Sequence, residues 1–411
     1  MPYQPPRGTR DLLPADMIKR QFIVDTARAV FERCGFDPLE TPGFEEYELL
    51  SAKAGEAIKQ EIYYFKDKSD RELGLRFDFT VPAARVVASN PDLPKPFRRY
   101  QIGPVWRYDR PGADRYREFW QADIDIFGAA SADADAEVVA CACEVIKKIG
   151  LSNFTVRINN RKLINSVLNA LGAKAVDVMR IIDKLDKIGE DGVREEMNNK
   201  GIPDVEKILK LVGIRNVEDI SVSDEEGKAG KEEVIQLLSR LKVFGCSAEF
   251  DMSLVRGLEY YTGNVFEIFQ EGGLTITAGG RYDNMVEQFG GKPTPAVGIS
   301  LGVDRLTNLV QMDLGKTKVN IFVANVKDSN KEKCIQLAGQ LRDLGVNVEY
   351  DVSGRQLSKQ LDYVNAKGIK FLLVVGEKEE KSGVVKLRNM VSGTEREIEL
   401  RNLNRITGMI D

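Results

Sequence analysis

The chain has 411 residues, a formal net charge of −4 and no histidine. Without an imidazole it has no Ser-His-Asp or Cys-His nucleophilic system, no histidine general base and no histidine metal ligand. No apolar run approaches the roughly 20 residues of a membrane span, and the N-terminus lacks the layout of a secretory signal. We therefore expect a protein of two or three domains that does not enter a membrane.

The five cysteines are scattered along the chain, and only Cys141 and Cys143 lie close together in sequence. A single intervening residue within a helix-like run suits neither a zinc knuckle nor a redox pair. We expect reduced thiols in a cytoplasmic protein, and no zinc site.

The first 130 residues predict one long helix followed by many short strands. Pro14 begins an amphipathic helix that runs through Phe31, and Gly35 ends it. The strand-like segments that follow are DPLETPGFEE, EIYYFKD, LGLRFDFT, FRRYQIGPVWRYD and FWQADIDIFG. Short strands with short turns predict a mainly antiparallel sheet, and DADAEVVACACEVIKKIG predicts a helix after it.

Residues 162–245 are helical in pattern and highly charged, which predicts a helical module inserted into the first domain. Strands resume with SAEFDMSLVRGLEYYTG. We predict that VRGLEYYTG and the following NVFEIF form one strand, with Arg256 and Tyr260 on one face and Tyr261 on the other. By itself this stretch is equally described as an amphipathic strand with one solvated face.

The C-terminal segment, after a polar linker near residues 313–318, alternates strands and helices. NIFVANV, VNVEYD and IKFLLVVG read as strands, with helices at about 330–344 and 355–366 between them. This βαβαβ order predicts a separate α/β domain with a parallel sheet.

Three arginines lie within apolar or aromatic sequence: Arg107 in VWRYD, Arg256 in VRGLEYY and Arg305 in GVDRL. Burying an unpaired guanidinium costs several kcal/mol, so carboxylates of the chain or anions of a ligand such as a triphosphate must neutralise them. No glycine-rich phosphate loop is present. For Arg305, a surface ion pair with the neighbouring Asp304 is an alternative.

Acidic residues accompany these arginines, namely Asp78, Asp109, Asp123 and Asp125. On a strand, Gln121, Asp123 and Asp125 share one face with Phe119 and Phe127. A carboxylate and an amide between aromatic rings describe a pocket for a polar, cationic ligand. Pairing of arginine and aspartate across neighbouring strands explains the same pattern.

These residues together resemble one family. RGTRDLLP, TVPAAR, WRYDRPGADRYREFWQADIDIFG, VRGLEYYTGNVFE, TAGGRYDNMVEQFGG and TPAVGISLGVDRL are similar to segments of histidyl-tRNA synthetase, and the resemblance covers nearly the whole chain. It implies an α+β fold: a class II synthetase sheet, mainly antiparallel and flanked by helices, a helical insertion, and a C-terminal α/β anticodon-binding domain. The implied domains are 1–161 with 246–315, then 162–245, then 318–411.

The resemblance also implies roles for single residues. Pro42 matches the proline at the dimer interface. Arg107 would bind the α-phosphate of ATP and Asp109 the adenine; Arg305 would bind the γ-phosphate, and Arg115 belongs to the same ATP site. Arg256 and Arg107 would be catalytic, and both would also contact histidine.

For histidine itself, the resemblance implies that Asp78, Thr80 and Gln121 bind the α-ammonium. Asp125 and Tyr261 would bind the imidazole, and Tyr260 would line the pocket. If VRGLEYYTG is a strand, these roles require a bend near Gly257 or Gly263, because the tyrosines would otherwise face apart. Asp78 and Asp125 stand where bacterial members have Glu, a feature similar to the archaeal and eukaryotic branch.

The implied activity is histidine–tRNA ligation. L-Histidine and ATP, with Mg²⁺, give histidyl-adenylate and pyrophosphate, and histidine then passes to tRNA(His) on a homodimeric cytoplasmic enzyme. One alternative is a catalytically silent regulatory subunit of ATP phosphoribosyltransferase, whose known forms usually lack the C-terminal module. Another is a class II enzyme for threonine, proline or glycine, which RGLEYY and QADID disfavour.

Overall fold

The computed structural model describes residues 3–52, 56–112, 115–255 and 260–410. It contains two compact units, one made of Met1–Asp11 and Phe22–Gln311, the other of Leu12–Gln21 and Met312–Asp411. Within the described ranges, no helix combines the length and the apolar character needed to cross a membrane.

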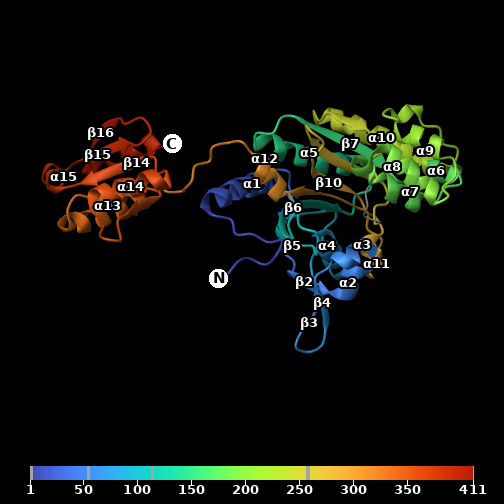
Figure 1. The fold of residues 1–411 in the computed structure, drawn as a ribbon, viewed down its shortest axis with the longest axis horizontal. Helices are drawn as coiled ribbons and strands as arrows, with labels where there is room; N and C mark the ends of the chain where they lie inside the picture. The colour runs from blue at the N-terminus through green and yellow to red at the C-terminus, as the bar shows by residue number, and fades with distance from the viewer. Residues whose placement is uncertain (1–2, 53–55, 113–114, 256–259, 411) are drawn as a thin grey trace. The chain divides into compact units, whose positions relative to one another are not determined.

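The first unit is built on an eight-stranded sheet with the order β1-β5-β6-β11-β10-β9-β7-β8 (Figure 1). Its strands are β1 (Asp37–Pro38), β5 (Phe97–Trp106), β6 (Glu118–Phe127), β7 (Phe154–Asn160), β8 (Ala248–Phe250), β9 (Asn264–Gln270), β10 (Thr275–Arg281) and β11 (Ala296–Gly302). Only the edge pairs β1–β5 and β7–β8 are parallel. This confirms the mainly antiparallel sheet predicted from the sequence.

Helices cover the face of this sheet to which the strands turn their apolar side chains. The predicted helices are present as α1 (Pro14–Arg33) and α5 (Ala132–Lys148). Ala122, Ile124 and Ile126 of β6 are buried in a core shared with α5. The intervening Gln121, Asp123 and Asp125 therefore point to the opposite face, as the period of two requires.

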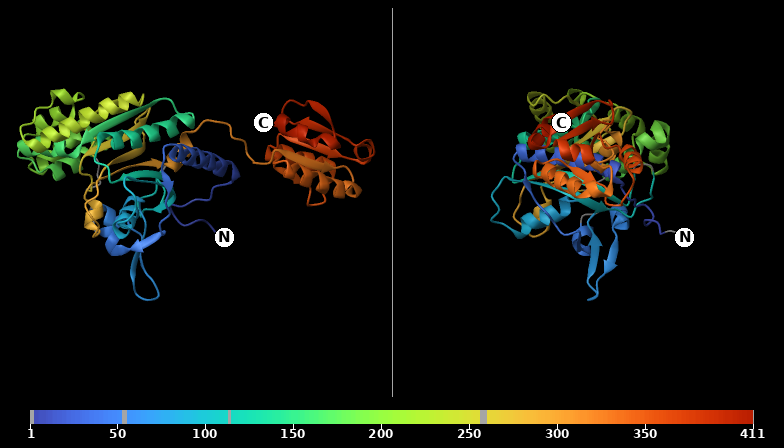
Figure 2. Two further views of the ribbon diagram at one scale, coloured as in Figure 1. Left: turned by 180° about the vertical axis from the view of Figure 1, so that it is seen from behind. Right: turned by 90° about the vertical axis from the view of Figure 1, so that its left-hand side faces the viewer.

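The opposite side of the sheet carries a smaller core that includes α4 (Thr80–Ser89) and α11 (Met285–Gln288). A separate three-stranded sheet, ordered β2-β4-β3, extends from this region (Figure 2). Its strands are β2 (Phe44–Glu46), β3 (Tyr64–Lys66) and β4 (Glu72–Leu75), with α2 (Tyr47–Ser51) and α3 (Glu56–Glu61) between them.

Residues 161–243 form a run of helices, as their sequence pattern predicted, while a separate insertion domain remains a prediction. The segment contains α6 (Arg161–Ala170), α7 (Ala175–Ile182), α8 (Leu185–Asn199), α9 (Val205–Val212), the 3₁₀ helix η1 (Val217–Asp219) and α10 (Glu225–Val243). Its apolar residues share one buried cluster with those of α5 and β7, so this segment packs onto the sheet unit.

The second unit has a five-stranded sheet with the order β13-β12-β14-β15-β16. The predicted βαβαβ is present as β12 (Ile321–Asn325), α13 (Lys331–Asp343), β13 (Val348–Tyr350), α14 (Leu357–Lys367) and β14 (Phe371–Val375), with η2 (Asp328–Asn330) before α13. The sequence analysis did not predict the antiparallel β15 (Val384–Asn389) and β16 (Glu395–Glu399). The remaining helices are α15 (Glu377–Ser382), η3 (Leu400–Ile406) and α16 (Thr407–Ile410).

Three strand predictions extended too far. Asp78 lies after the end of β4, and Arg107 and Asp109 lie after the end of β5. Within VRGLEYYTG, residues 260–263 form a turn and loop and β9 starts only at Asn264, while residues 256–259 lie outside the described part of the chain. Just before β9, a Cβ at Gly263 would lie 3.1 Å from Arg281 Cδ, so the close approach of the Arg281 side chain favours glycine there.

A buried polar network anchors the residues around β9 and β10. Arg281 forms an ion pair with Asp135 of α5, and its Nη1 donates to Ala129 O at 2.9 Å. Asn264 Nδ2 donates to the same carboxylate at 2.8 Å. Because Arg281 and Asp135 are almost fully buried, each depends on the other for charge compensation.

Arg281→Met should lower the free energy of unfolding by roughly 3–5 kcal/mol, since Asp135 would remain buried without its cation. Urea denaturation followed by tryptophan fluorescence measures this change, because both tryptophans, Trp106 and Trp120, lie in the sheet unit. The matched control is Arg240→Met, whose partner Asp133 is exposed and whose loss should cost less than about 1 kcal/mol. Equal losses in the two variants would contradict the buried-pair argument.

Candidate active site

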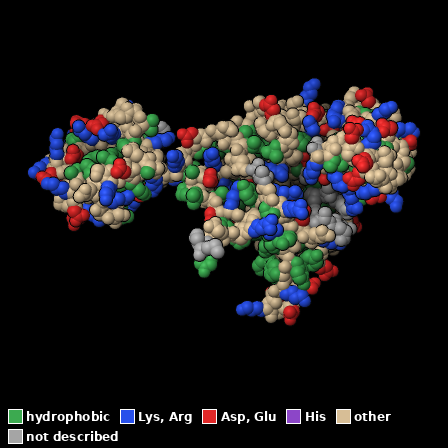
Figure 3. Space-filling view, viewed as in Figure 1, with side chains coloured by type: hydrophobic (Ala, Val, Ile, Leu, Met, Phe, Trp, Pro, Cys, Tyr) green, Lys and Arg blue, Asp and Glu red, His purple; other side chains and the backbone are tan. Residues whose placement is uncertain are grey.

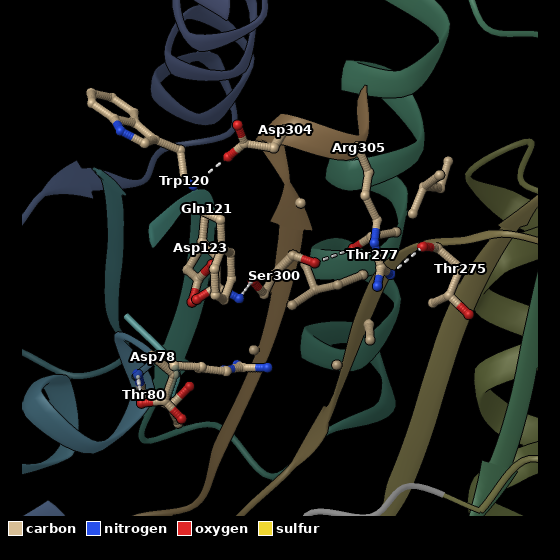
Figure 4. A pocket seen from close by; sticks show the side chains of 18 of the residues that line it. Asp78, Thr80, Trp120, Gln121, Asp123, Thr275, Thr277, Ser300, Asp304 and Arg305 are labelled. Carbon is tan, nitrogen blue, oxygen red and sulfur yellow. Dashed lines mark hydrogen bonds between the residues drawn. The ribbon is translucent and has the colours of Figure 1, made fainter. Parts of the chain in front are cut away.

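A pocket of about 540 Å³ lies on the polar face of the eight-stranded sheet (Figure 4). The predicted histidine- and ATP-binding residues within the described ranges all line it: Asp78, Thr80, Arg107, Asp109, Arg115, Gln121, Asp125, Tyr260, Tyr261 and Arg305. Arg256 lies outside the described residues. Pro42, predicted at a dimer interface, is exposed and is not among the lining residues. The structure thus brings distant segments together, while the role of each residue remains a prediction.

Asp78 occupies the connection between β4 and α4. Its Oδ1 accepts hydrogen bonds from the backbone N–H groups of Thr80 (3.1 Å) and Val81 (3.2 Å), so it caps the first turn of α4. Burial raises the pKa of the Asp78 carboxyl to about 6, against the opposing effects of the Val81 hydrogen bond and the charge of Arg107. Its second oxygen, Oδ2, has no hydrogen-bond partner among the described residues.

Arg107 follows β5 and is held from two sides. Its Nε donates to the carbonyl of Phe77 at 3.1 Å, and its guanidinium lies over the ring of Phe119, 5.2 Å from the ring centre. Asp109 and Arg115 form an ion pair with each other at the pocket. More than half of the Arg115 side chain is exposed, so this pair contributes little to stability and is available to a ligand.

Arg305 of α12 (Val303–Leu309) approaches the pocket from the opposite side. Its Nη1 donates to Thr275 O at 2.6 Å, a contact drawn in Figure 4. Asp304 pairs with Arg10 at 2.6 Å, and its other oxygen accepts from the backbone N–H of Trp120 at 2.6 Å. The surface ion pair between Asp304 and Arg305 was an alternative, but Asp304 pairs with Arg10. This pair connects the N-terminal RGTRDLLP segment with the GVDRL segment.

Asp125 lies at the base of the pocket in a fully buried ion pair. Arg99 of β5 stands directly opposite on the neighbouring strand, with Nη2 2.5 Å from Asp125 Oδ2, and the Tyr282 hydroxyl donates to Oδ1. On the other side, β11 presents Gly298, where a Cβ would meet Asp125 Oδ1 at 1.9 Å. Cross-strand pairing of Arg and Asp, an open alternative at this position, is thus present beneath the pocket.

Gln121 and Asp123 meet Ser300 of β11 on the same face (Figure 4). Gln121 Nε2 donates to Ser300 Oγ at 2.8 Å. The Ser300 hydroxyl is also close enough to Asp123 to lower the pKa of its carboxyl. Burial raises the pKa of Asp123 to about 8; Arg99 and Ser300 oppose this shift, and the charges of Asp125 and Asp78 add to it.

Tyr260 and Tyr261 enter the same pocket from the loop before β9. Their rings are 4.9 Å apart and steeply tilted, and the ring of Tyr260 is 6.0 Å from that of Tyr282. A Cβ at Gly280 would meet Tyr261 at 2.7 Å, so this glycine leaves the space that the ring fills. Since the tyrosines belong to a loop, they line one pocket without the strand bend that the sequence analysis required.

The sequence analysis did not assign Arg99, Tyr282 or Ser300 to the site, and it placed Asp123 on the face of the predicted pocket without giving it an individual role. A signal was present for two of them: Asp123 shares the period of Gln121 and Asp125, and GISLG places Ser300 between two glycines on one strand face. Arg99 and Tyr282 required the pairing of β5, β6 and β11. The described residues contain no cluster of three or more His, Cys, Asp and Glu side chains that could hold a metal ion.

Comparison with known proteins agrees with this geometry. Residues 8–306 match the family described as histidyl-tRNA synthetase, and residues 319–406 match the anticodon binding domain. The chain belongs to the histidyl-tRNA synthetase family. The histidine–tRNA ligase of Aeropyrum pernix is 40% identical over 410 residues, covering 95% of this chain and 94% of that protein. That of Pyrococcus horikoshii is 37% identical over 417 residues, covering 97% and 96%.

Solved structures of the family share the fold. The histidyl-tRNA synthetase from Nostoc sp. PCC 7120 superposes with a TM-score of 0.84 at 30% identity and covers all of both chains. A protein from Bacillus halodurans C described as an ATP phosphoribosyltransferase regulatory subunit/histidyl-tRNA synthetase gives 0.77 at 28% identity, covering 88% of this chain and 96% of its own. The class II synthetase fold expected from the sequence is confirmed.

The raised pKa of Asp123 makes stability depend on pH in a defined direction. Between about pH 4 and pH 8 the folded protein keeps a proton on Asp123 that the unfolded chain has lost, so this group makes folding less favourable as the pH rises. Asp123→Asn removes that titration. The stability of the variant relative to wild type should therefore increase between about pH 5 and pH 8, by at most a few kcal/mol.

Thermal unfolding of the ligand-free protein across this pH range is the measurement. Glu118→Gln, an exposed carboxylate on the same strand, is the control and should show a difference from wild type that does not change with pH. A pH-independent difference for Asp123→Asn as well would contradict the assignment of a retained proton.

Proposed function

We propose that the chain is a histidine–tRNA ligase. It activates L-histidine with ATP to histidyl-adenylate and pyrophosphate, then transfers histidine to the 3′ end of tRNA(His). The observation that carries this proposal is the division of one pocket into two regions. Arginines line the part expected to receive ATP, while carboxylates and an amide line the part expected to receive the amino acid. The family relationship gives this division its chemical meaning.

In the activation step, the histidine carboxylate attacks the α-phosphorus of ATP and pyrophosphate leaves. The attacking group is already a nucleophile at neutral pH, so the enzyme needs no imidazole base. Its contribution is to position the reactants and stabilise the charge that develops at phosphate. Arg107 and Arg256 are the proposed catalytic residues at the α-phosphate, and Arg305 is proposed to bind the γ-phosphate.

Asp109 and Arg115 are proposed to bind the adenine end of ATP, exchanging part of their mutual pairing for contacts with the nucleotide. Mg²⁺ is written here as part of the substrate, since it prefers phosphate oxygens and water to an all-protein site. The phosphates then meet Arg107, which follows β5, and Arg305 of α12. Cations on separate segments favour an extended charge over a single anion.

The histidine side chain is proposed to bind against Asp125, Tyr260 and Tyr261. Arg99 compensates the charge of Asp125, and Tyr282 fixes its orientation. A site that offers a fixed acceptor to a ring N–H rejects isosteres without that donor steeply, because the buried acceptor would remain unpaired. The shorter Asp125 is thus supported by Arg99 of the neighbouring β5 and by Tyr282, which follows β10.

The regulatory-subunit alternative is not favoured. The curated archaeal relatives are histidine–tRNA ligases that align over nearly the whole chain, including the anticodon binding domain. The arginines at the pocket also have no regulatory explanation as direct as phosphate binding.

Contacts with tRNA are proposed for the helical segment 162–245 and for the C-terminal domain. Arg355, Lys359 and Lys367 are basic residues of the C-terminal domain that could contact an anticodon. Arg355 pairs with Asp351 at 2.6 Å and lies over the Tyr363 ring, 4.1 Å from its centre. Lys367 pairs with Glu349 at 2.5 Å, and Lys359 is exposed on α14. Internal ion pairs therefore account for Arg355 and Lys367, and Lys359 is the better candidate.

A homodimer is proposed through the face that carries Pro42. Phe44 and Phe65 are exposed on the three-stranded sheet with their rings 6.2 Å apart, next to an exposed Tyr64. Figure 3 shows hydrophobic side chains gathered over β2 and β4. An apolar patch of this kind beside the predicted interface proline supports association. The cytoplasmic location expected from the sequence remains a prediction.

Histidine-dependent exchange of pyrophosphate into ATP tests the proposed activity, with all twenty amino acids assayed separately. Exchange should occur with histidine alone. Removing Arg256 or Arg107 should reduce it by roughly 10²–10³ or more, as expected for losing a group that stabilises transition-state charge. Exchange with another amino acid would contradict the pocket assignment, and histidine binding without any exchange would favour the regulatory subunit.

Phe44→Asp should shift the protein from dimer to monomer, because a carboxylate would be buried without a partner in the interface. Sedimentation velocity measures the mass directly. Val243→Asp, at a strongly exposed apolar residue of α10, is the control and should leave the mass unchanged. A dimeric Phe44→Asp variant would place the interface elsewhere.

A further inference from the structure

Four buried acceptor atoms that line the pocket form no hydrogen bond with the described residues, and one of them, Asp125 Oδ2, faces Arg99 in an ion pair. The other three have no such cation within the described ranges. Asp78 Oδ2, Gln121 Oε1 and Asp123 Oδ1 are buried and have no hydrogen-bond partner among the described residues. All three residues line the same pocket, and Asp78 and Asp123 are close enough for the charge of one to act on the other. Buried polar atoms are nearly always paired in native proteins, so a group of unpaired acceptors in a pocket indicates missing donors.

The three residues are held in place by contacts through their other polar atoms. Asp78 uses Oδ1 to cap α4. Ser300 Oγ accepts a hydrogen bond from Gln121 Nε2 at 2.8 Å, so the Oε1 of the amide points away from this contact. The proton of the Ser300 hydroxyl is then available for Asp123. Gln121 and Asp123 share one face of β6 and lie beside Ser300 of β11 (Figure 4).

These acceptors differ in charge compensation from Asp125, which is proposed to bind the imidazole. Asp125 is compensated by Arg99 at 2.5 Å, so that pair is neutral in sum and suits a neutral ring. In contrast, no described Lys or Arg side chain forms a salt bridge with Asp123 or Asp78. The ligand-free protein keeps a proton on Asp123 near neutral pH, and a cationic ligand group would displace it. Two carboxylates and an amide oxygen without a paired cation then suit a cationic group with several N–H donors.

We propose that Asp123 is a further substrate-binding residue, which accepts a hydrogen bond from the α-ammonium of histidine together with Asp78 and Gln121. The proposal rests on the proposed function and adds a residue that the resemblance did not assign. A primary ammonium has three N–H donors, which matches the three acceptors. Asp123 also supplies a second carboxylate where this chain has the shorter Asp78, and Ser300 is the positioning residue for the group.

The test is the affinity of the full-length protein for three compounds, measured by isothermal titration. These are L-histidine, 3-(imidazol-4-yl)propanoate, which lacks only the ammonium, and β-(2-thienyl)alanine, which keeps the ammonium but has no ring N–H. Asp123→Asn preserves the size of the side chain. It should reduce the preference for histidine over the propanoate roughly tenfold to a hundredfold, as expected for a hydrogen bond to a charged group.

The same variant should leave the preference for histidine over thienylalanine unchanged, because Asp125 would still bind the ring. Ser300→Ala should reduce the same ammonium-dependent preference. Glu118→Gln, which replaces a carboxylate of the same strand outside the pocket, should behave as wild type.

Each other outcome overturns the proposal for a distinct reason. Equal weakening of histidine and the propanoate by Asp123→Asn would make Asp123 a structural residue only. A lost preference against thienylalanine would assign Asp123 to the ring. Failure of the wild-type protein to bind histidine would overturn the proposed function itself, and the proposal with it.

Discussion

The ion pair between Arg99 and Asp125 is the constraint on which the pocket depends. Both side chains are buried, so neither charge is tolerable without the other, and their strands are held in the register that places them face to face. Phe79 O accepts from Arg99 at 3.1 Å, and Tyr282 donates to Asp125. Gly298 must lack a side chain for the carboxylate to fit. Five segments of the chain therefore have to be placed correctly before the site exists.

This constraint explains how charge is distributed in the pocket. The base is neutral because Arg99 compensates Asp125, and the middle is rich in acceptors from Asp78, Gln121 and Asp123. The arginines line the part of the pocket that is proposed to receive the phosphates. A zwitterionic amino acid fits this order in one direction only, with its carboxylate toward Arg107. This arrangement also explains why the proposed reaction needs no histidine side chain in the enzyme. Fixed acceptors would provide the selectivity and fixed cations would provide the rate.

Much of the fold could be predicted from local sequence patterns, because tertiary packing did not change the structure that these patterns favour. The alternation in QADIDIF correctly placed Gln121 and Asp125 on one face, and the continuous apolar run IKFLLVV correctly marked β14. The errors arose where a loop is held by contacts distant in sequence. Asp78 leaves the strand because its carboxylate caps α4, and Tyr260 and Tyr261 belong to a loop beside Gly280. The Arg281–Asp135–Asn264 network joins three elements that no sequence period connects.

A crystal structure of the protein with L-histidine tests this account most directly. The account predicts that the ammonium nitrogen lies within about 2.7–3.2 Å of oxygens of Asp78, Gln121 and Asp123, while a ring nitrogen contacts Asp125. A histidine bound in the reverse direction, or an ammonium held without Asp123, would contradict it.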